Sequence, residues 1–518
     1  MLASGTLIVR VSAKGDIQGN AVSAAERLEP LSAFAAPAAP LKPTAWHKLT
    51  YSLGQSPQSG GFDTAIAFAF FYYTAVLGLS GALVGLALGV SLAFDAVVDP
   101  LVGSWSDGLQ ARLGRRLTPM LLATPLMALA LIGLFAPPKG LSPLLLFGWL
   151  TVASVSARSF ISLFNVPYFA LGAEMADDYV ERSSIVSYRA LAGLVFGVAV
   201  NLIAFSVFFG GKMGLRRADA YPGFGLVSAL IVAVPSLVCV LGLRGYVARL
   251  RQPTPHREAM WRRLPGEVAE VFSNRSFRQL FIGSVIFGAG VGLNGALNSH
   301  AAVYVWRLPP KALQLPTYAY ILGILGGVVI TPTLLRWFEK RTLVLVGLGD
   351  IIAIWTALPV LRAVGVIHWI GAAAVPPLMI NALVVGVGVG LLAVALPSMM
   401  ADAADEHEYL TGNARQGLYS SGLGFAGKAA AGLGAMVAGL ALDIIGFPVA
   451  PGVGAPAVIS EPIIQRLMIA HGPAAAVLGV TALFFTGAYA VTRKRHAEIL
   501  RALEARRGST INHVGLAE

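Results

Sequence analysis

Long apolar segments without formal charge dominate the chain. None of Asp, Glu, Lys or Arg occurs in seven segments: 117–138, 190–211, 220–243, 279–306, 312–335, 363–401 and 467–492. Five more apolar segments hold isolated charges: about 58–79, 82–106, 141–172, 342–361 and 411–443. About 18 apolar residues suffice for a helix that crosses a bilayer, and helices satisfy their own backbone polar groups there. The pattern predicts an all-α membrane protein with twelve transmembrane helices.

The composition agrees with this pattern. Only 12% of the 518 residues are charged and 56% are hydrophobic, whereas roughly a quarter of a soluble domain is charged. These values exclude a soluble globular enzyme and a disordered protein, and the single Cys239 excludes an internal disulfide. The sequence has no His-Glu-x-x-His motif, no phosphate-binding loop and no Cys/His cluster. We therefore expect no enzymatic activity, no cofactor and no metal other than a coupling Na⁺.

Basic residues gather on one side when the loops are assigned alternately to two sides of the membrane. That side takes Arg112, the loop around Arg336, the central segment and the tail from Arg493. The positive-inside rule then places both termini in the cytoplasm, in a bacterial inner membrane. The net charge of +12 orients the chain against anionic lipid headgroups, so we expect a lipid bilayer and no nucleic acid as partner.

Polar segments divide the chain into five parts. The ends are rich in Ala, Ser and Pro or in charge, and the centre is basic. We expect a flexible cytoplasmic extension (1–44), a six-helix half (45–247), a cytoplasmic linker (248–276), a second six-helix half (277–495) and a cytoplasmic tail (496–518).

A short repeat relates the two halves. Met175-Ala-Asp177 and Met400-Ala-Asp402 lie 225 residues apart, each at the cytoplasmic end of the fourth predicted helix of its half. Six-helix repeats are typical of transporters, whose substrate site lies between the repeats near the middle of the membrane. The repeat therefore favours a transporter with two halves in one major facilitator fold.

Two carboxylates lie within the second predicted helix. Asp95 and Asp99 are four residues apart and share one helix face. Because like charges repel in the membrane, the pair requires a cation between them or a proton on one of them. The pair is a candidate coupling site for Na⁺ or H⁺. The alternative is a structural ion pair with Arg158, which could also replace the coupling cation.

Three basic residues lie in or at the ends of predicted helices. Arg158 falls within the fourth, Arg189 opens the fifth and Lys428 lies in the eleventh. If all three face one cavity they outnumber the acidic pair, and an anionic or zwitterionic substrate would balance them. Each can instead pair with a fixed acid such as Asp350 of the ninth predicted helix.

A charged turn joins the second and third predicted helices. Asp107 precedes Gly114-Arg115-Arg116, and the carboxylate can hold an arginine across the turn. Such a cluster can act as a cytoplasmic gate that closes one conformation and opens in the other. The alternative is that these charges only determine topology.

Several motifs together resemble the glycoside–pentoside–hexuronide:cation symporters of the major facilitator superfamily. The resemblance runs from about residue 48 to 447 and rests on Tyr72-Tyr73-Thr74, Asp95-Ala-Val-Val-Asp99-Pro100, Gly114-Arg115-Arg116-x-x-Pro119, Asn165-Val-Pro167-Tyr168 and Met400-Ala-Asp402 through Gly412. It implies that Asp95 and Asp99 bind the coupling cation with help from the Ser162 hydroxyl. It also matches Arg189 and Lys428 to a conserved arginine and lysine of that family.

The sequence departs from the family at the sugar-binding positions. Ser59 stands where the first-helix sugar aspartate is expected, Asn165 where the fourth-helix one is, and Phe169 replaces a stacking tryptophan. Val98 replaces an asparagine between the cation aspartates, and Arg158 is an added charge. The resemblance thus implies cation coupling, with Arg158, Asn165, Phe169, Arg189 and Lys428 facing a substrate other than a simple galactoside.

We therefore predict a monomeric secondary transporter that couples Na⁺ or H⁺ to symport of a sugar-like or anionic small solute by alternating access. An acidic sugar, another organic anion or a lipid-like anion would fit the charges. One alternative is a flippase of lysophospholipid-like amphiphiles, because the animal lysophospholipid transporters share the acidic pair and the lysine. The other is a membrane sensor, but the linker and tails are too short to hold a soluble domain.

Overall fold

The computed structural model describes residues 42–514 except 177, 251–259, 414 and 449–458. Within these residues all regular elements are helices, and eleven helices are long and apolar enough to cross a membrane. The long elements are α3 (Gly81–Gly108), α4 (Gly114–Phe135), α5 (Pro143–Glu174), α6 (Tyr179–Ile203), α7 (Ala220–Val247), α9 (Arg275–His300), α10 (Leu315–Leu334), α11 (Lys340–Ala363), α12 (Val375–Thr411) and α13 (Gln416–Ile445), followed by the consecutive helices α14 (Glu461–His471) and α15 (Pro473–Gly487). The expected flexible extension lies almost wholly outside the described residues.

The first predicted span differs from expectation. Instead of one helix from about residue 58, the structure has a run of short helices from Ala45 to Val76: α1 (Ala45–Ser52), η2 (Leu53–Gln55), η3 (Pro57–Phe62), α2 (Asp63–Phe71) and η4 (Tyr72–Val76). Thr44 begins this run by capping α1, its hydroxyl accepting a hydrogen bond from the His47 amide. Polar residues between 52 and 59 lower the hydrophobicity of this segment, although some of their side chains are hydrogen-bonded inside the protein. Ser56, for example, donates to the carbonyl of Val232.

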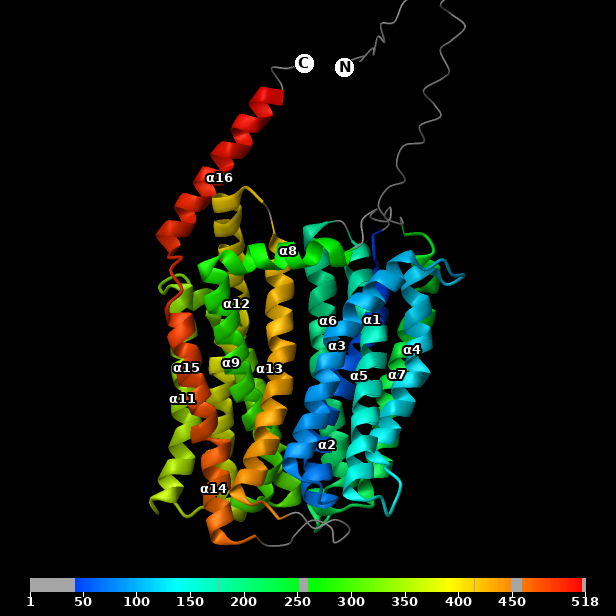
Figure 1. Cartoon of the computed structure of the whole chain (residues 1–518), viewed down its shortest axis with the longest axis vertical. Coiled ribbons are helices and arrows are strands. Elements are labelled where there is room, and N and C mark those ends of the chain that lie inside the picture. Colours follow the sequence, from blue (N-terminus) through cyan, green and yellow to red (C-terminus); the bar gives the residue numbers. More distant parts are fainter. Residues whose placement is uncertain (1–41, 177, 251–259, 414, 449–458, 515–518) are drawn as a thin grey trace, which may run out of the picture. The chain divides into compact units, whose positions relative to one another are not determined.

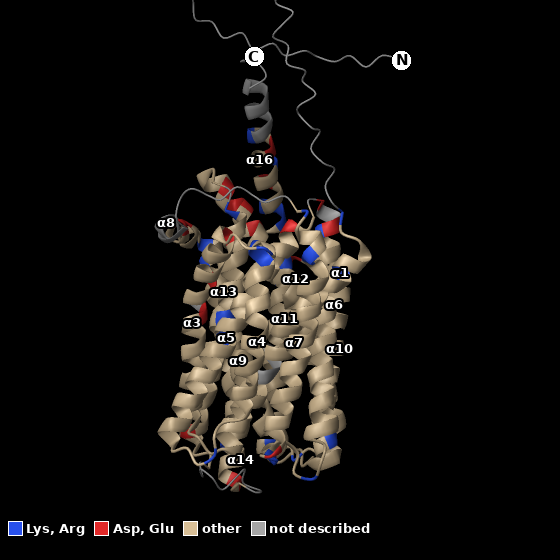
Figure 2. Ribbon diagram, turned by 90° about the vertical axis from the view of Figure 1, so that its right-hand side faces the viewer, with Lys and Arg blue, Asp and Glu red and all other residues tan. Residues whose placement is uncertain are grey.

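The long helices form two groups that match the two halves of the sequence. In the first, α5 packs on α3 and α4, and α4 also packs on α7. In the second, α12 packs on α10 and α11, while α9 packs on α13 and α15 (Figure 1). The mid-section of both groups is almost free of charge, and charged side chains gather at the helix ends (Figure 2).

Two amphipathic or polar helices mark one end of the bundle. Helix α8 (Met260–Ser273) lies across the helix ends, and α16 (Arg493–Val514) extends from the same end (Figure 1). Helix α1 begins there too, since the His47 ring lies 4.4 Å from that of Tyr246 near the end of α7. We call this the α8 end, which the charge pattern predicts to be cytoplasmic, and the other the opposite end.

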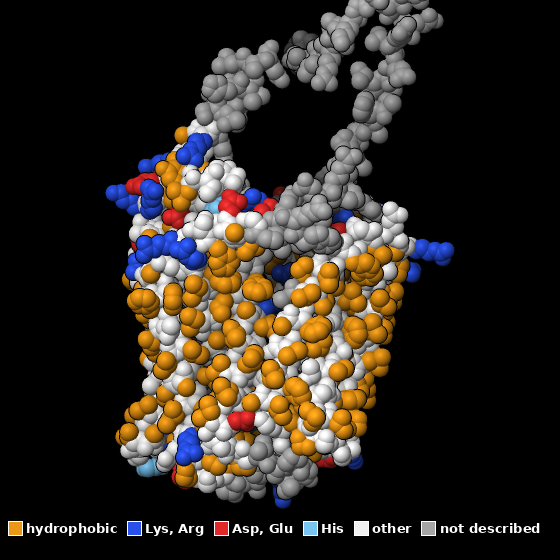
Figure 3. Space-filling model, viewed as in Figure 1, with side chains coloured by type: hydrophobic (Ala, Val, Ile, Leu, Met, Phe, Trp, Pro, Cys, Tyr) orange, Lys and Arg blue, Asp and Glu red, His pale blue; other side chains and the backbone are white. Residues whose placement is uncertain are grey.

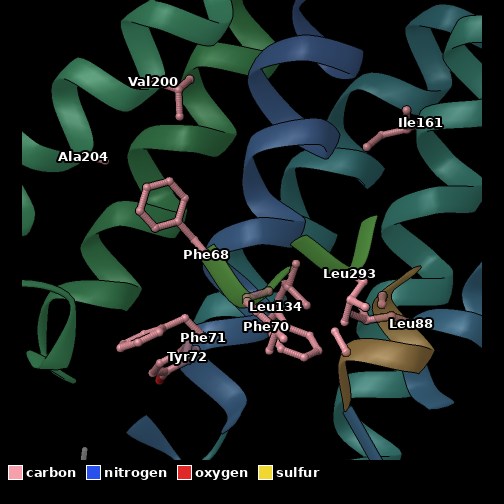
Figure 4. Packing of buried hydrophobic residues seen from close by; sticks show 14 of the residues in the cluster. Phe68, Phe70, Phe71, Tyr72, Leu88, Leu134, Ile161, Val200, Ala204 and Leu293 are labelled. Atoms are coloured by element: carbon pink, nitrogen blue, oxygen red, sulfur yellow. The ribbon is translucent and has the colours of Figure 1, made fainter. Parts of the chain in front are cut away.

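Among the described residues, the two groups pack closely toward the opposite end. There α3 packs on α13, and α2 packs on α9. The aromatic residues Phe70, Phe71 and Tyr72 are buried in the core near this end (Figure 4). The Thr74 hydroxyl and His300 Nε2, from the two different groups, lie 2.9 Å apart. Toward the α8 end the surface is hollowed between the groups, with Lys or Arg side chains set back in the hollow (Figure 3). The conformation is therefore open toward the α8 end.

Candidate functional site

Asp95 is the most enclosed charged group at the centre of the bundle. Only 2% of the residue is exposed, on the face of α3 that meets α5 and α13. Ser162 of α5 donates a hydrogen bond to its Oδ1. Its Oδ2 lies 3.5 Å from Arg158 Nη1 and 3.1 Å from Lys428 Nζ. Both oxygens are thus occupied by groups that sequence reasoning had selected.

Asp99 lies one turn further along α3 and shares Lys428 with Asp95. The Lys428 ammonium donates to Asp99 Oδ2, while Asp99 Oδ1 is buried without a hydrogen-bond partner among the described residues. The Lys428 side chain remains 47% exposed although it lies within α13. Lys428 therefore joins the two halves through their acidic pair while about half of its side chain stays exposed.

Arg158 supplies the second cation of this cluster. It is 5% exposed, and its Nε donates to the hydroxyl of Ser91 at 3.3 Å. Sequence reasoning did not select Ser91, although it lies one turn before Asp95 on the same face of α3. The suggestion that Asp350 pairs with Lys428 is wrong: Asp350 lies beside Gly388 of α12, and Lys428 binds the acidic pair.

The charges of the cluster balance. Two carboxylates, Asp95 and Asp99, face two cations, Arg158 and Lys428. A compensated cluster is tolerated in a low-dielectric interior, whereas removal of one partner leaves a costly buried charge. A cation or proton that binds either carboxylate must therefore change that carboxylate's contacts with Arg158 or Lys428.

Asn165 and Phe169 lie on the same face of α5 as Arg158 and Ser162, closer to the α8 end. We call these four residues the α5 stripe. Asn165 Nδ2 donates to Gln58 Oε1 at 3.0 Å, and its own Oδ1 is buried without a partner among the described residues. Phe169 is 41% exposed, and the Arg189 guanidinium lies 4.9 Å from its ring centroid. Arg189 thus joins the stripe through Phe169. Sequence reasoning did not select Gln58, which stands at the very start of the first predicted span, because a polar residue at a helix end is expected to face water.

The predicted charged turn also comes together, with one addition. Arg116 Nη1 lies 2.7 Å from Asp107, and Arg116 Nη2 lies 2.7 Å from Glu174. Arg115 binds the same Glu174 oxygen at 2.8 Å. Glu174 ends α5 at the α8 end, so this cluster ties the ends of α3, α4 and α5. Glu174 could have been selected from the sequence, because it is the first acidic residue after the long apolar segment of α5.

The second half has a comparable cluster at the same end. Lys340, which begins α11, binds Asp402 of α12 at 2.7 Å. His496 of α16 lies 3.0 Å from Asp405 and 3.5 Å from Asp402. A basic residue in the first turn of the third helix of each half thus contacts an acid of the fourth, toward the end that the charge pattern predicts to be cytoplasmic. The repeat partner Asp177 lies outside the described residues.

Comparisons with known proteins agree with this architecture. Residues 51–493 match the family model described as MFS/sugar transport protein. The chain is 25% identical to an uncharacterized symporter, YnaJ, of Bacillus subtilis (strain 168), over 90% of this chain and 96% of that protein. It is 23% identical to a glucuronide carrier protein homolog of Escherichia coli (strain K12), over 88% and 95% of the two chains.

A solved structure shows the same fold. The inward open conformation of the xylose transporter XylE from E. coli matches with a TM-score of 0.55 at 15% identity, over 88% of this chain and 98% of that one. At this identity the likeness is one of fold.

Proposed function

Because the chain belongs to the MFS/sugar transport protein family of multi-pass membrane transporters, within the glycoside:cation symporters, we propose that it couples Na⁺ or H⁺ to the symport of a sugar-like anionic solute by alternating access. The two halves would rock about the cluster formed by Asp95, Asp99, Arg158 and Lys428, exposing it to one side at a time.

The observation that carries this proposal is the dual engagement of Lys428. Its ammonium neutralises Asp95 and Asp99 while about half of its side chain is exposed. A cation or proton arriving at the unpartnered Asp99 Oδ1 would compete with Lys428 for the acidic pair. Lys428 would then be free to bind an anion from the hollow.

Coupling follows from this competition. Cation binding would favour anion binding because it releases Lys428, and by reciprocity the anion would favour the cation. Arg158 stays enclosed beside Asp95 and keeps that carboxylate compensated throughout. The coupling cation is thus assigned to Asp99 and the anion to Lys428.

The remaining residues of the stripe fit a solute with both sugar-like and acidic character. Asn165 offers a buried amide oxygen, and Phe169 offers an exposed ring face. Arg189 adds positive charge above that ring. That one relative is named for a glucuronide, an acidic sugar conjugate, supports the same class.

Thermal unfolding of the detergent-purified protein tests this proposal. A compound that binds the folded state raises the apparent melting temperature. We expect methyl glucuronide to do so more strongly than the neutral methyl glucoside, and more strongly with Na⁺ or at lower pH. Lys428→Gln should remove the preference for the acid, and Asp99→Asn should remove the effect of the cation.

Stabilisation by the neutral glucoside alone would contradict the anion assignment. Stabilisation by lysophosphatidylcholine but by neither sugar would favour the flippase instead. The variant Arg217→Gln, which alters an exposed basic residue outside the hollow, serves as the matched control and should respond like the wild type.

A further inference from the structure

Helix α3 begins at the opposite end without a cap from its own chain segment. Ser80 occupies the N-cap position, but its side chain caps no amide of α3. Instead, Asp443 near the end of α13 in the other half accepts three hydrogen bonds. They come from the Ser80 hydroxyl at 2.5 Å, the Gly81 amide at 2.8 Å and the Ala82 amide at 3.1 Å. One half thus caps a helix of the other.

A closely packed seam between α3 and α13 continues from this cap, with glycines Gly81, Gly85 and Gly89 against α13. Leu88 is spaced i+7 from Gly81 and lies on the same face of α3, so it belongs to the seam. A methyl group added at Gly85 would lie 2.8 Å from the Ala435 carbonyl oxygen. The backbones therefore approach so closely that the seam can separate only by moving one half away from the other.

We propose that Asp443 is the latch that holds the opposite end of the transporter closed. A carboxylate at a helix N-terminus binds otherwise unpaired amides and is favoured by the helix dipole. The latch lies at an exposed end of the bundle, so water can replace both partners when it opens. The same contact can therefore break and form during each transport cycle.

The latch and the central cluster lie on the same antiparallel helix pair. Asp443 and Lys428 belong to α13, and the groups they bind belong to α3. Fifteen residues separate Lys428 from Asp443, which corresponds to about 22 Å of helix. The role in transport rests on the proposed function: once a cation has released Lys428, the Asp443 cap is the side-chain hydrogen bonding that still joins α3 to α13 among the described residues. The latch itself can be tested without any solute.

A cysteine in the seam reports on opening. Leu88 is 2% exposed, so Leu88→Cys should react slowly with a water-soluble maleimide in the purified protein. The native Cys239 is fully buried and provides the background rate. Adding Asp443→Ala should raise the labelling rate at least about tenfold, because one lost hydrogen bond changes an equilibrium roughly fivefold and three are removed. Asp443→Asn, which keeps one acceptor oxygen, should give an intermediate rate.

Asp219→Asn is the matched control. Asp219 is an exposed acid of the first half, outside the seam, and it pairs with Arg217 two residues away. This variant should leave the labelling rate unchanged. If Asp443→Ala elutes as a folded monodisperse protein but labels at the wild-type rate, the latch is refuted. If Asp443→Ala does not fold, the same comparison with Asp443→Asn decides.

The outcomes separate this inference from the proposed function. Faster labelling of the Asp443 variants, with no effect of Na⁺ or pH on labelling, would support the latch and contradict cation coupling. Unchanged labelling together with cation-dependent stabilisation by methyl glucuronide would contradict the latch alone.

Discussion

Asp95 and Asp99 have the same charge and share one helix face, yet their surroundings differ. Asp95 is enclosed by Ser162, Arg158 and Lys428, and each of its oxygens has a partner. Asp99 has one buried oxygen without a partner among the described residues. A carboxylate with both oxygens occupied holds its neighbours in place, whereas one with a free oxygen can accept a new ligand. Asp95 is therefore the carboxylate that keeps its partners, which we call the fixed member, and Asp99 is the one that can exchange them.

Arg158→Ala tests the fixed member. Removing the guanidinium leaves Asp95 compensated by Lys428 alone, and loss of one partner of a buried pair costs about 3 kcal/mol. We expect a clearly lower apparent melting temperature. In an Asp95→Asn background the same substitution should cost less, because the buried charge is gone. Equal losses in both backgrounds would show that Arg158 stabilises the protein independently of Asp95.

The sequence predicted which residues belong to this site better than which of these residues bind one another. The four-residue spacing of Asp95 and Asp99 places them on one face by helix geometry alone. Whether Arg158 and Lys428 bind these acids or Asp350 depends on contacts between helices far apart in the chain, with 329 residues between Lys428 and Asp99. Periodicity within one helix carries no information on such contacts, so both interpretations stood open until the structure placed the helices.

Helix α8 shows how the central linker is held at the scale of an element. Arg415, before α13, binds Glu267 and Glu270 of α8 at 2.9 and 3.1 Å. Asn413 donates to Glu270 at 2.7 Å, and His407 of α12 lies 3.3 Å from it. The hydrogen bonds from Asn413 and Arg415 lower the pKa of Glu270 and outweigh the opposing effect of desolvation. The linker is thus fastened to the second half by an ionised carboxylate.

This fastening should weaken in acid. Because the folded-state pKa of Glu270 lies below its ordinary value, the ionised form contributes stability above that value, and the contribution is lost as the pH falls through the lowered pKa. A spin label at the exposed Gly266→Cys should therefore become more mobile as the pH falls below the ordinary titration range of a glutamate. Glu270→Gln should give the mobile spectrum already at neutral pH. A spectrum independent of pH in the wild type would contradict this role of Glu270.

Elements with long apolar runs were predictable, and the first span was not. Charge-free segments such as 220–243 correspond to single helices, because length and apolarity decide membrane insertion. The run from Ala45 to Val76 contains Gln55, Gln58 and several small residues that lower its apparent hydrophobicity. Some of its polar side chains are hydrogen-bonded to other helices, as Gln58 is to Asn165. Only tertiary structure shows that such a segment belongs inside the bundle.

At the scale of the whole molecule, the two halves are joined at one end and separate at the other. Asp443 and the glycine seam close the opposite end. Toward the α8 end the surface between the halves is hollowed, with Lys or Arg side chains set back in the hollow (Figure 3). This arrangement is one state of an alternating-access cycle. The repeat in the sequence predicted two halves, but it could not predict which end is open.

The most direct test of the central claim is solute uptake into proteoliposomes under an imposed gradient. We predict that wild-type protein accumulates labelled methyl glucuronide against its gradient when Na⁺ or H⁺ is higher outside, and that Asp99→Asn only equilibrates it. Accumulation by Asp99→Asn equal to that of the wild type, or wild-type uptake that no cation gradient changes, would contradict the assignment of the coupling site.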